Sequence, residues 1–164
     1  MALAVHVRRA NLADAQTIAD FVNHSRSGNY VTRQSVIERF SQVGFMIAYQ
    51  KSYVAGLLGW QIENLVIRVT DFLIGPLEDR IATGQALIQA MEDHGAELLA
   101  EASMLFLPQN PSEQLLNYWE QFGYTYQKVQ DLHRAWREAV SEWDTGADGV
   151  MLKQLRERLT NRPV

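Results

Sequence analysis

The sequence predicts an α/β (α+β) fold in which a mixed, mostly antiparallel, twisted sheet of about seven strands is flanked by helices. Three observations support this prediction. Short runs rich in β-branched and aromatic residues recur along the chain, with turn residues between them. Stretches with apolar residues three and four positions apart separate several of these runs, as in helices with one buried face. The composition, 47% hydrophobic and 21% charged, is that of a globular domain with a sizeable core.

The first part of the chain predicts a strand and two helices. Residues 5–9 alternate apolar and polar side chains, which indicates a strand with one buried face. Asn11 is placed to cap the first helix, with Asp14 near the positive end of the helix dipole. Thr32 is placed to cap the second helix, and Gly44 is the expected stop signal.

Three strands and a helix are expected next. Residues 45–49 and 53–61 are separated by a short polar turn, which predicts an antiparallel hairpin. Residues 65–74 predict a third strand, because a long apolar run there ends in a Gly-Pro pair. A helix is expected over residues 79–94, with Gly95 in its stop signal.

The rest of the chain alternates strands with helices. Strands are expected over residues 103–107, 124–129 and 150–155. The helix between the strands over residues 103–107 and 124–129 is expected to begin at the cap residue Ser112 and to end at Gly123. An extra helix over residues 132–143 precedes the last strand, because two tryptophans share an apolar stripe there. These Trp residues either pack on the sheet or, if exposed, form a contact in a homodimer.

Length and composition restrict the possible functions. The 164 residues fit one domain, 1–164, with a core over residues 5–155 and a polar tail over residues 156–164. The absence of cysteine excludes disulfides, thiolate nucleophiles and zinc–thiolate centres. The four histidines lack metal-ligand spacing, so no metal site is expected.

Charge and hydropathy point to a protein of the cytoplasm. The net charge of -4 gives no global basic field that would collect nucleic acid or an anionic membrane. The sequence shows neither a secretory signal nor an apolar run of membrane-spanning length. We therefore expect no nucleic-acid and no membrane partner.

Five stretches of the sequence carry a resemblance to a known family. They are 54–57 (VAGL), 72–76 (FLIGP), 77–88 (LEDRIATGQALI), 115–124 (LLNYWEQFGY) and 150–155 (VMLKQL). With the order of the elements, they resemble the GNAT superfamily of acyl-CoA-dependent N-acetyltransferases over about residues 5 to 155. The resemblance implies a GNAT-like fold and the direct transfer of an acetyl group from acetyl-CoA to an amine, either a small molecule or a peptide.

The resemblance also implies where the acyl donor binds. In the family, the loop after the fourth strand and the helix start behind it present backbone N–H groups to the pyrophosphate. Ala82 and Gly84 keep small residues at the two glycine positions, whereas Asp79 stands where Arg or Gln is usual and Arg80 follows it. The cofactor-binding residues implied are Phe72, Leu73, Ile74, Arg80, Ile81, Ala82, Thr83, Gly84 and Asn110.

The same resemblance implies candidate catalytic residues. Asp71 and Glu63 are the carboxylates that can take up the amine proton through water, or both are ordinary strand carboxylates. The family's usual Tyr acid falls on Trp119, which fits the buried helical stripe. The candidate acid is therefore its neighbour Tyr118; otherwise another group acts, the thiolate leaves unassisted, or no transfer takes place.

In the family, the loop between the first two helices commonly forms one wall of the site that binds the acceptor amine. The corresponding loop here is polar. Its candidate substrate-binding residues are His24, Arg26, Asn29 and Tyr30, although the loop can equally be a plain polar connection. Two other functions stay open. One is a catalytically inactive GNAT-like ligand-binding or interaction module, suggested by Asp79 and Trp119, and the other is a structural dimer module.

Overall fold

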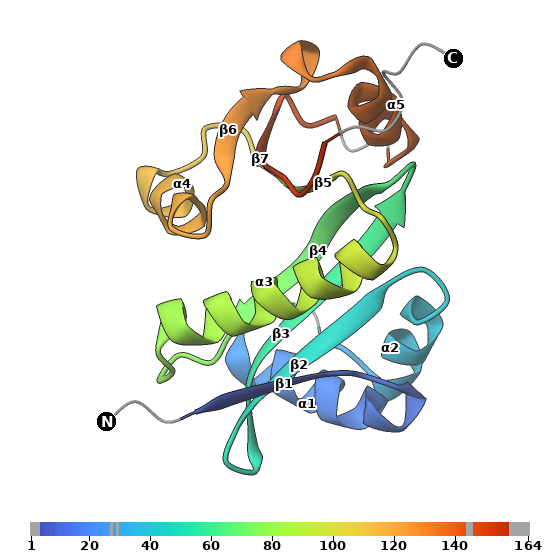
Figure 1. Ribbon diagram of the computed structural model, residues 1–164. Coiled ribbons are helices and arrows are strands. Elements are labelled where there is room, and N and C mark those ends of the chain that lie inside the picture. Colours follow the sequence, from blue (N-terminus) through green and yellow to red (C-terminus); the bar gives the residue numbers. More distant parts are fainter. Residues whose placement is uncertain (1–3, 27, 29, 144–145, 158–164) are drawn as a thin grey trace. The chain divides into compact units, whose positions relative to one another are not determined.

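The computed structural model describes residues 4–26, 28, 30–143 and 146–157 (Figure 1). Its seven-stranded sheet has the order β1-β2-β3-β4-β5-β7-β6. The strands are β1 (Val5–Arg9), β2 (Gly44–Gln50), β3 (Tyr53–Glu63), β4 (Val66–Ile74), β5 (Ala102–Phe106), β6 (Thr125–Lys128) and β7 (Gly149–Gln154). The α-helices are α1 (Ala15–Ser25), α2 (Arg33–Arg39), α3 (Arg80–Glu97), α4 (Glu113–Glu120) and α5 (Arg134–Trp143).

The pairing is mixed and mostly antiparallel, which confirms the predicted fold class. β1 pairs with β2, β2 with β3, and β7 with both β5 and β6 in antiparallel register. β4 and β5 are parallel, in register from Val66 and Ala102 to Val69 and Leu105. The predicted extra helix is α5, which precedes β7.

Two glycines predicted to stop helices have other roles. α2 ends at Arg39, and Gly44 begins β2, where a Cβ would collide with the indole of Trp60. α3 continues past Gly95 to Glu97, and a Cβ on Gly95 would collide with Ile67. Both glycines are thus required by close packing rather than by helix termination.

Asn11 forms a cap, but the helix behind it begins differently from the prediction. Its side chain accepts the N–H of Ala13, and the Asp14 carboxylate accepts the N–H of Asn11, in a capping box. The turn that this box closes is a 3-10 helix over Leu12–Asp14, and α1 starts at Ala15. Arg8 holds Asp14 from β1 at 2.6 Å.

The chain divides into two compact units, each made of two stretches. The first contains Met1–Gln61 and Thr70–Met91, and the second contains Ile62–Val69 and Glu92–Val164. In the first unit, α1 and α2 pack on the sheet. Its buried apolar residues include Ile18 and Val22 of α1, Val36 of α2, Phe45 of β2 and Leu57 of β3.

The second unit has a core built on α5. Trp136 is 6% exposed and packs with the buried residues Val66 of β4, Met104 of β5 and Val150 of β7. Its indole N–H donates to Glu101 Oε1 at 3.2 Å. The prediction that Trp136 packs on the sheet is confirmed, because its side chain lies in this core.

A buried polar network also lies in the second unit. The Tyr124 hydroxyl is 3.0 Å from Glu92 Oε2 and 2.8 Å from Ser103 Oγ. Since a phenol carries one proton, it donates to the carboxylate and accepts from the serine. Lys153 Nζ donates to the other Glu92 oxygen at 2.8 Å. Burial and the charge of Glu92 raise the pKa of Tyr124 well above its ordinary value, so the phenol stays neutral.

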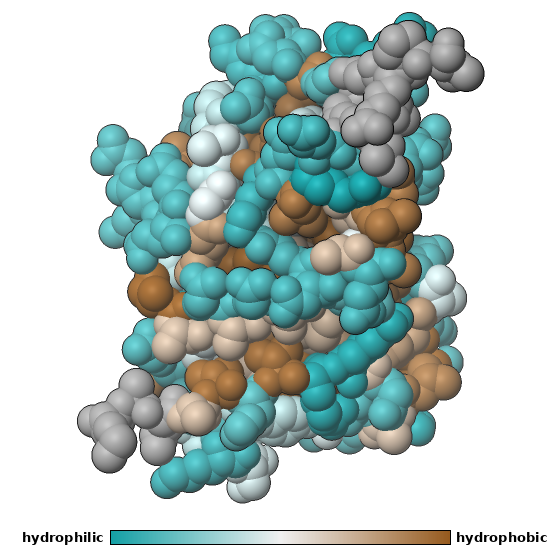
Figure 2. Space-filling model, in the orientation of Figure 1, coloured by the Kyte–Doolittle hydropathy of each residue, from teal (hydrophilic) through white to brown (hydrophobic). Residues whose placement is uncertain are grey.

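Hydrophilic residues cover most of the face shown in Figure 2, with hydrophobic residues scattered between them. Among the described residues, none of the helices combines the length and the apolar character that crossing a membrane requires. The predicted tail lies outside the described residues from position 158 onward.

Candidate functional site

The start of α3 is capped by an acidic side chain. Asp79 Oδ1 accepts the N–H groups of Ile81 at 3.0 Å and Ala82 at 2.9 Å. The Asp79 carbonyl accepts the N–H of Thr83 at 3.0 Å. The first N–H groups of a helix have no partner within it, so a carboxylate here satisfies them and complements the helix dipole. The chain's own carboxylate thus engages the amides that the resemblance assigns to a pyrophosphate.

The other residues at this helix start suit a close approach to the backbone. Ala82 is half-buried, Thr83 and Gly84 are buried, and Arg80 and Ile81 are exposed. Asp79 is exposed as well, so turning its carboxylate into solvent costs about one N-cap interaction, ~1 kcal/mol. The residues therefore fit an anionic group once the Asp79 side chain has turned away.

A cavity of about 360 Å³ lies in the first unit. Apolar side chains from α1, α2, β2, β3 and β4 line it, among them Ile18, Val36, Phe45, Leu57 and Phe72. Its polar lining residues are Arg26, Ser35, Arg39, Thr70 and Asp71. An apolar pocket with a few convergent polar groups is the usual form of a small-molecule site.

The strongest polar feature of this cavity is an ion pair between α2 and β4. Arg39 Nη1 and Nη2 donate to Asp71 Oδ1 and Oδ2 at 2.9 Å and 2.7 Å, a two-pronged geometry that fixes both groups. The Thr70 hydroxyl donates to Asp71 Oδ2 at 2.7 Å. The Arg39 guanidinium also lies over the Phe45 ring, 5.3 Å from its centroid.

This environment keeps Asp71 ionised. Burial by itself would raise the pKa of Asp71, but the hydrogen bonds from Arg39 and Thr70 outweigh it. The charges of Arg39 and Arg26 act in the same direction, and the pKa of Asp71 lies below its ordinary value. Asp71 is consequently an ionised hydrogen-bond acceptor and a weak base.

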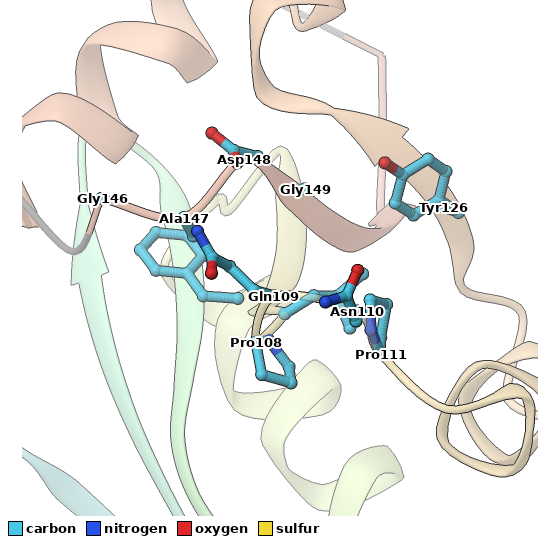
Figure 3. Close-up of a pocket in the computed structure, with 11 residues that line it drawn as sticks. Pro108, Gln109, Asn110, Pro111, Tyr126, Gly146, Ala147, Asp148 and Gly149 are labelled. Carbon is cyan, nitrogen blue, oxygen red and sulfur yellow. The ribbon is translucent and has the colours of Figure 1, made fainter.

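The second unit has an open pocket of about 890 Å³ at the end of β5 (Figure 3). Figure 3 shows the Pro108–Pro111 loop on one side and the Gly146–Gly149 segment on the other. Asn110, the predicted cofactor contact, lines this pocket with a φ of 53°. A Cβ on Gly149 would lie 2.7 Å from the Tyr126 ring, so this glycine makes room for the aromatic side chain in the wall.

The structure brings some predicted site residues together. Arg26, Asp71, Phe72 and Leu73 all line the cavity of the first unit. Ile74 is buried at the end of β4. The acceptor-loop residues His24 and Tyr30 are exposed and are absent from that cavity's lining, and the predicted Asn29 lies outside the described residues.

The other catalytic candidates belong to the second unit. Glu63 ends β3 with a half-buried side chain. Tyr118 is half-buried on α4, and its ring packs edge-on against Phe122 with centroids 5.0 Å apart. Its neighbour Trp119 is 1% exposed, which confirms the prediction that this residue belongs to the core.

Sequence reasoning missed Arg39, the ion-pair partner of Asp71. The two residues are far apart in the chain, so no local spacing links them. A partial signal existed, because Ser35 and Arg39 are four residues apart and so lie on one face of α2. Among the described residues, no cluster of His, Asp and Glu side chains is arranged to hold a metal ion.

Comparison with known proteins gives matches among solved structures alone. No model of a protein family matches the sequence, and no curated protein does. The GNAT-family acetyltransferase from Staphylococcus aureus Mu50 matches with a TM-score of 0.70 and 13% identity, covering 93% of this chain and 100% of that one.

Two further structures match over nearly their whole length. PaiA N-acetyltransferase from Thermoplasma acidophilum, in complex with coenzyme A, has a TM-score of 0.68 at 14% identity, with 93% and 99% of the two chains covered. YncA from Salmonella typhimurium, with its cofactor acetyl-CoA, has a TM-score of 0.66 at 12% identity, with 98% and 99% covered. At such identities the likeness is one of fold, and the chain described here has the fold of the GNAT acetyltransferases.

Proposed function

We propose that this protein is an N-acetyltransferase that moves an acetyl group from acetyl-CoA to an amine. The observation that carries the proposal is the fold, shared over at least 93% of the chain with acetyltransferases that include complexes with coenzyme A and acetyl-CoA. The cavity beside β4 supports it, because a pocket with apolar walls and a fixed carboxylate suits a small amine.

The donor would be held by backbone groups of β4 and by the start of α3. The proposed contacts are Phe72, Leu73, Ile74, Arg80, Ile81, Ala82, Thr83, Gly84 and Asn110. Acetyl-CoA supplies an acetyl group activated as a thioester. Its binding requires the Asp79 carboxylate to leave the N–H groups of Ile81 and Ala82, and the exposed Arg80 adds a positive charge beside them.

The reaction is a direct transfer. The amine nitrogen bonds to the acetyl carbon, the carbon–sulfur bond breaks, and the sulfur leaves with the bonding electrons and takes up a proton. One amine proton passes to solvent. The sequence has no cysteine that could carry the acetyl group on a thiol.

The chain's own residues would orient the amine and move these protons. Asp71 accepts a hydrogen bond from the amine and, being a weak base, passes the proton on through water. Glu63 is the second carboxylate proposed for this path. Tyr118 is the proposed proton donor to the leaving sulfur. The acceptor is a small-molecule or peptide amine, and location in the cytoplasm, a homodimer and the lack of nucleic-acid and membrane partners stay sequence-based predictions.

Thermal unfolding with and without acetyl-CoA tests the donor site. Ligand at about 100 times its dissociation constant adds roughly 2.7 kcal/mol of stability, which for a domain of this size is a shift of several degrees. Release of free thiol in the presence of amines then tests transfer. A shift together with amine-dependent thiol release is the expected result, and a folded protein that shows neither contradicts the proposal.

The second candidate function is a ligand-binding or interaction module without catalysis. One observation favours it: the helix-start amides are already capped by Asp79. On this alternative, millimolar acetyl-CoA leaves the unfolding temperature unchanged while a ligand of the first-unit cavity raises it.

A further inference from the structure

We propose that the cavity of the first unit selects an amine that also carries a carboxylate and an apolar side chain, the chemistry of an apolar α-amino acid. The inference rests on the proposed function and names the class of its acceptor. Three features of the cavity support it: its walls, its charges and the way in which one of the charges is fixed.

The walls of the cavity are apolar on several sides. Ile18 and Val22 of α1, Val36 of α2, Phe45 of β2 and Leu57 of β3 contribute hydrocarbon surface, and all five are at most 8% exposed. A polar or charged side chain placed here would lose its hydration without a partner. An aliphatic or aromatic side chain would instead gain about 25 cal/mol for each Å² of apolar surface removed from water.

Among the described residues that line the cavity, the charged groups are two guanidinium groups and one carboxylate. These described groups are Arg26, Arg39 and Asp71, so together they carry one net positive charge. A simple monoamine or polyamine, which is cationic at neutral pH, meets that excess charge unfavourably. An amino acid satisfies both signs, because its ammonium group can approach Asp71 while its carboxylate approaches the arginines.

The guanidinium of Arg39 is preorganised for binding such a ligand. A guanidinium has five N–H donors, and Asp71 takes two of those of Arg39. The remaining donors keep a fixed direction because the pair is two-pronged and the guanidinium lies over Phe45. Groups that are already ordered lose little side-chain entropy on binding, and the planar fork matches a carboxylate.

Calorimetric titration at pH 7 tests the ligand class with matched compounds. The probes are L-leucine, 3-methylbutylamine, which lacks its carboxylate, and 4-methylpentanoate, which lacks its amine. L-phenylalanine and 2-phenylethylamine form a second pair with a larger side chain. Each titration is run with and without coenzyme A. We expect at least one of the two amino acids to bind ten times more tightly than its analogues. Equal or tighter binding of the amines, or no binding of either amino acid, overturns the inference.

Variants locate the binding site. Arg26→Gln and Arg39→Gln are expected to weaken amino-acid binding at least tenfold. Arg39→Lys should weaken it less, because the ammonium keeps the positive charge, but should not restore the parent affinity, because an ammonium cannot bind a carboxylate with two prongs. The matched control is Arg33→Gln, which removes the same charge from the first residue of α2, outside the cavity lining. Circular dichroism verifies that each variant is folded. A loss equal to that of the control for both Arg26 and Arg39 overturns the assignment.

Failure of this inference and failure of the proposed function give different results. Amino-acid binding without thiol release from acetyl-CoA supports the ligand class and contradicts the acetyltransferase. Thiol release that is as fast with 3-methylbutylamine as with L-leucine supports the acetyltransferase and overturns the ligand class.

Discussion

Two ion pairs of similar length sit in very different surroundings. Arg39 and Asp71 in the first unit are 2.7 Å apart, with side chains 44% and 24% exposed. Lys153 and Glu92 in the second unit are 2.8 Å apart, with side chains 31% and 9% exposed. The first pair lines a cavity, whereas the second is joined to the buried Tyr124 hydroxyl.

The contrast in burial indicates which pair can contact a ligand. A buried charge needs a complete set of partners, so Glu92, with a lysine on one oxygen and a phenol on the other, has a structural role. A half-exposed pair contributes little to stability, but it can share its donors and acceptors with an incoming molecule. Substitutions in the Lys153–Glu92 pair should therefore mainly lower stability, whereas substitutions in the Arg39–Asp71 pair should mainly weaken ligand binding.

The largest expected effect is that of Lys153→Met. Removing the lysine leaves the buried Glu92 carboxylate without its cation, so the free energy of unfolding should fall by about 2–3 kcal/mol. Urea unfolding measures it. Lys128→Met on the exposed edge strand β6 is the control and should stay within about 0.5 kcal/mol of the parent. Equal losses for the two variants would show that Glu92 does not depend on Lys153.

Tyr124→Phe should have the next largest effect. The change removes a hydroxyl that both Glu92 and Ser103 use, at a cost of about 1–2 kcal/mol. The comparison predicts that amino-acid binding in the first unit stays unchanged, which the titration described above would measure. A variant as stable as the parent would mean that water replaces the phenol.

Arg39→Gln should cost about 1 kcal/mol of stability at pH 7, since Asp71 loses its cation but remains partly solvated. The loss has a defined pH dependence. The pKa of Asp71 is lowered in the folded protein, so the stabilisation is present above the unfolded pKa of about 3.9 and is lost as the pH falls through the folded value. Parent and variant should thus begin to converge in unfolding experiments as the pH falls below about 4, and a difference that persists once the pH lies below the folded pKa of Asp71 would contradict the ion-pair explanation.

The smallest effect on stability is expected at Asp79. Asparagine is as good an N-cap as aspartate, so Asp79→Asn should change the free energy of unfolding by less than about 0.5 kcal/mol, whereas Asp79→Ala should cost about 1 kcal/mol. Removing one negative charge near a pyrophosphate is worth about 1 kcal/mol at 4 Å in water, or about fivefold in acetyl-CoA affinity. Tighter binding by Asp79→Ala than by Asp79→Asn would show that the cap, rather than the charge, opposes the donor.

Much of the fold could be predicted because its signals are local. The caps at Thr32 and Ser112 both form, and each accepts the N–H of a residue three positions later. The burial of Trp119 followed from a helical stripe that is visible in the sequence. These features depend on residues within one or two helical turns of each other, and sequence spacing encodes such distances directly.

The parts that sequence reasoning missed depend on distant contacts. Gly44 and Gly95 looked like helix stops, but Trp60 and Ile67 explain them, and neither contact lies within one helical turn. The pairing of Arg39 with Asp71 joins a helix to a strand 32 residues further on. A single sequence contains no periodicity that reports such a meeting, so the cavity's charge pattern became visible only in the structure.

The path of the chain through the two units has a consequence for protein engineering. β3, β4 and α3 each begin in one unit and end in the other, so the chain crosses between the units three times. No single truncation can therefore isolate either unit with all of its own strands. Expression of residues 1–61 or 92–164 as fragments would leave a strand or helix half missing. Circular permutation would not help, because the four segments alternate between the two units even when the ends of the chain are joined.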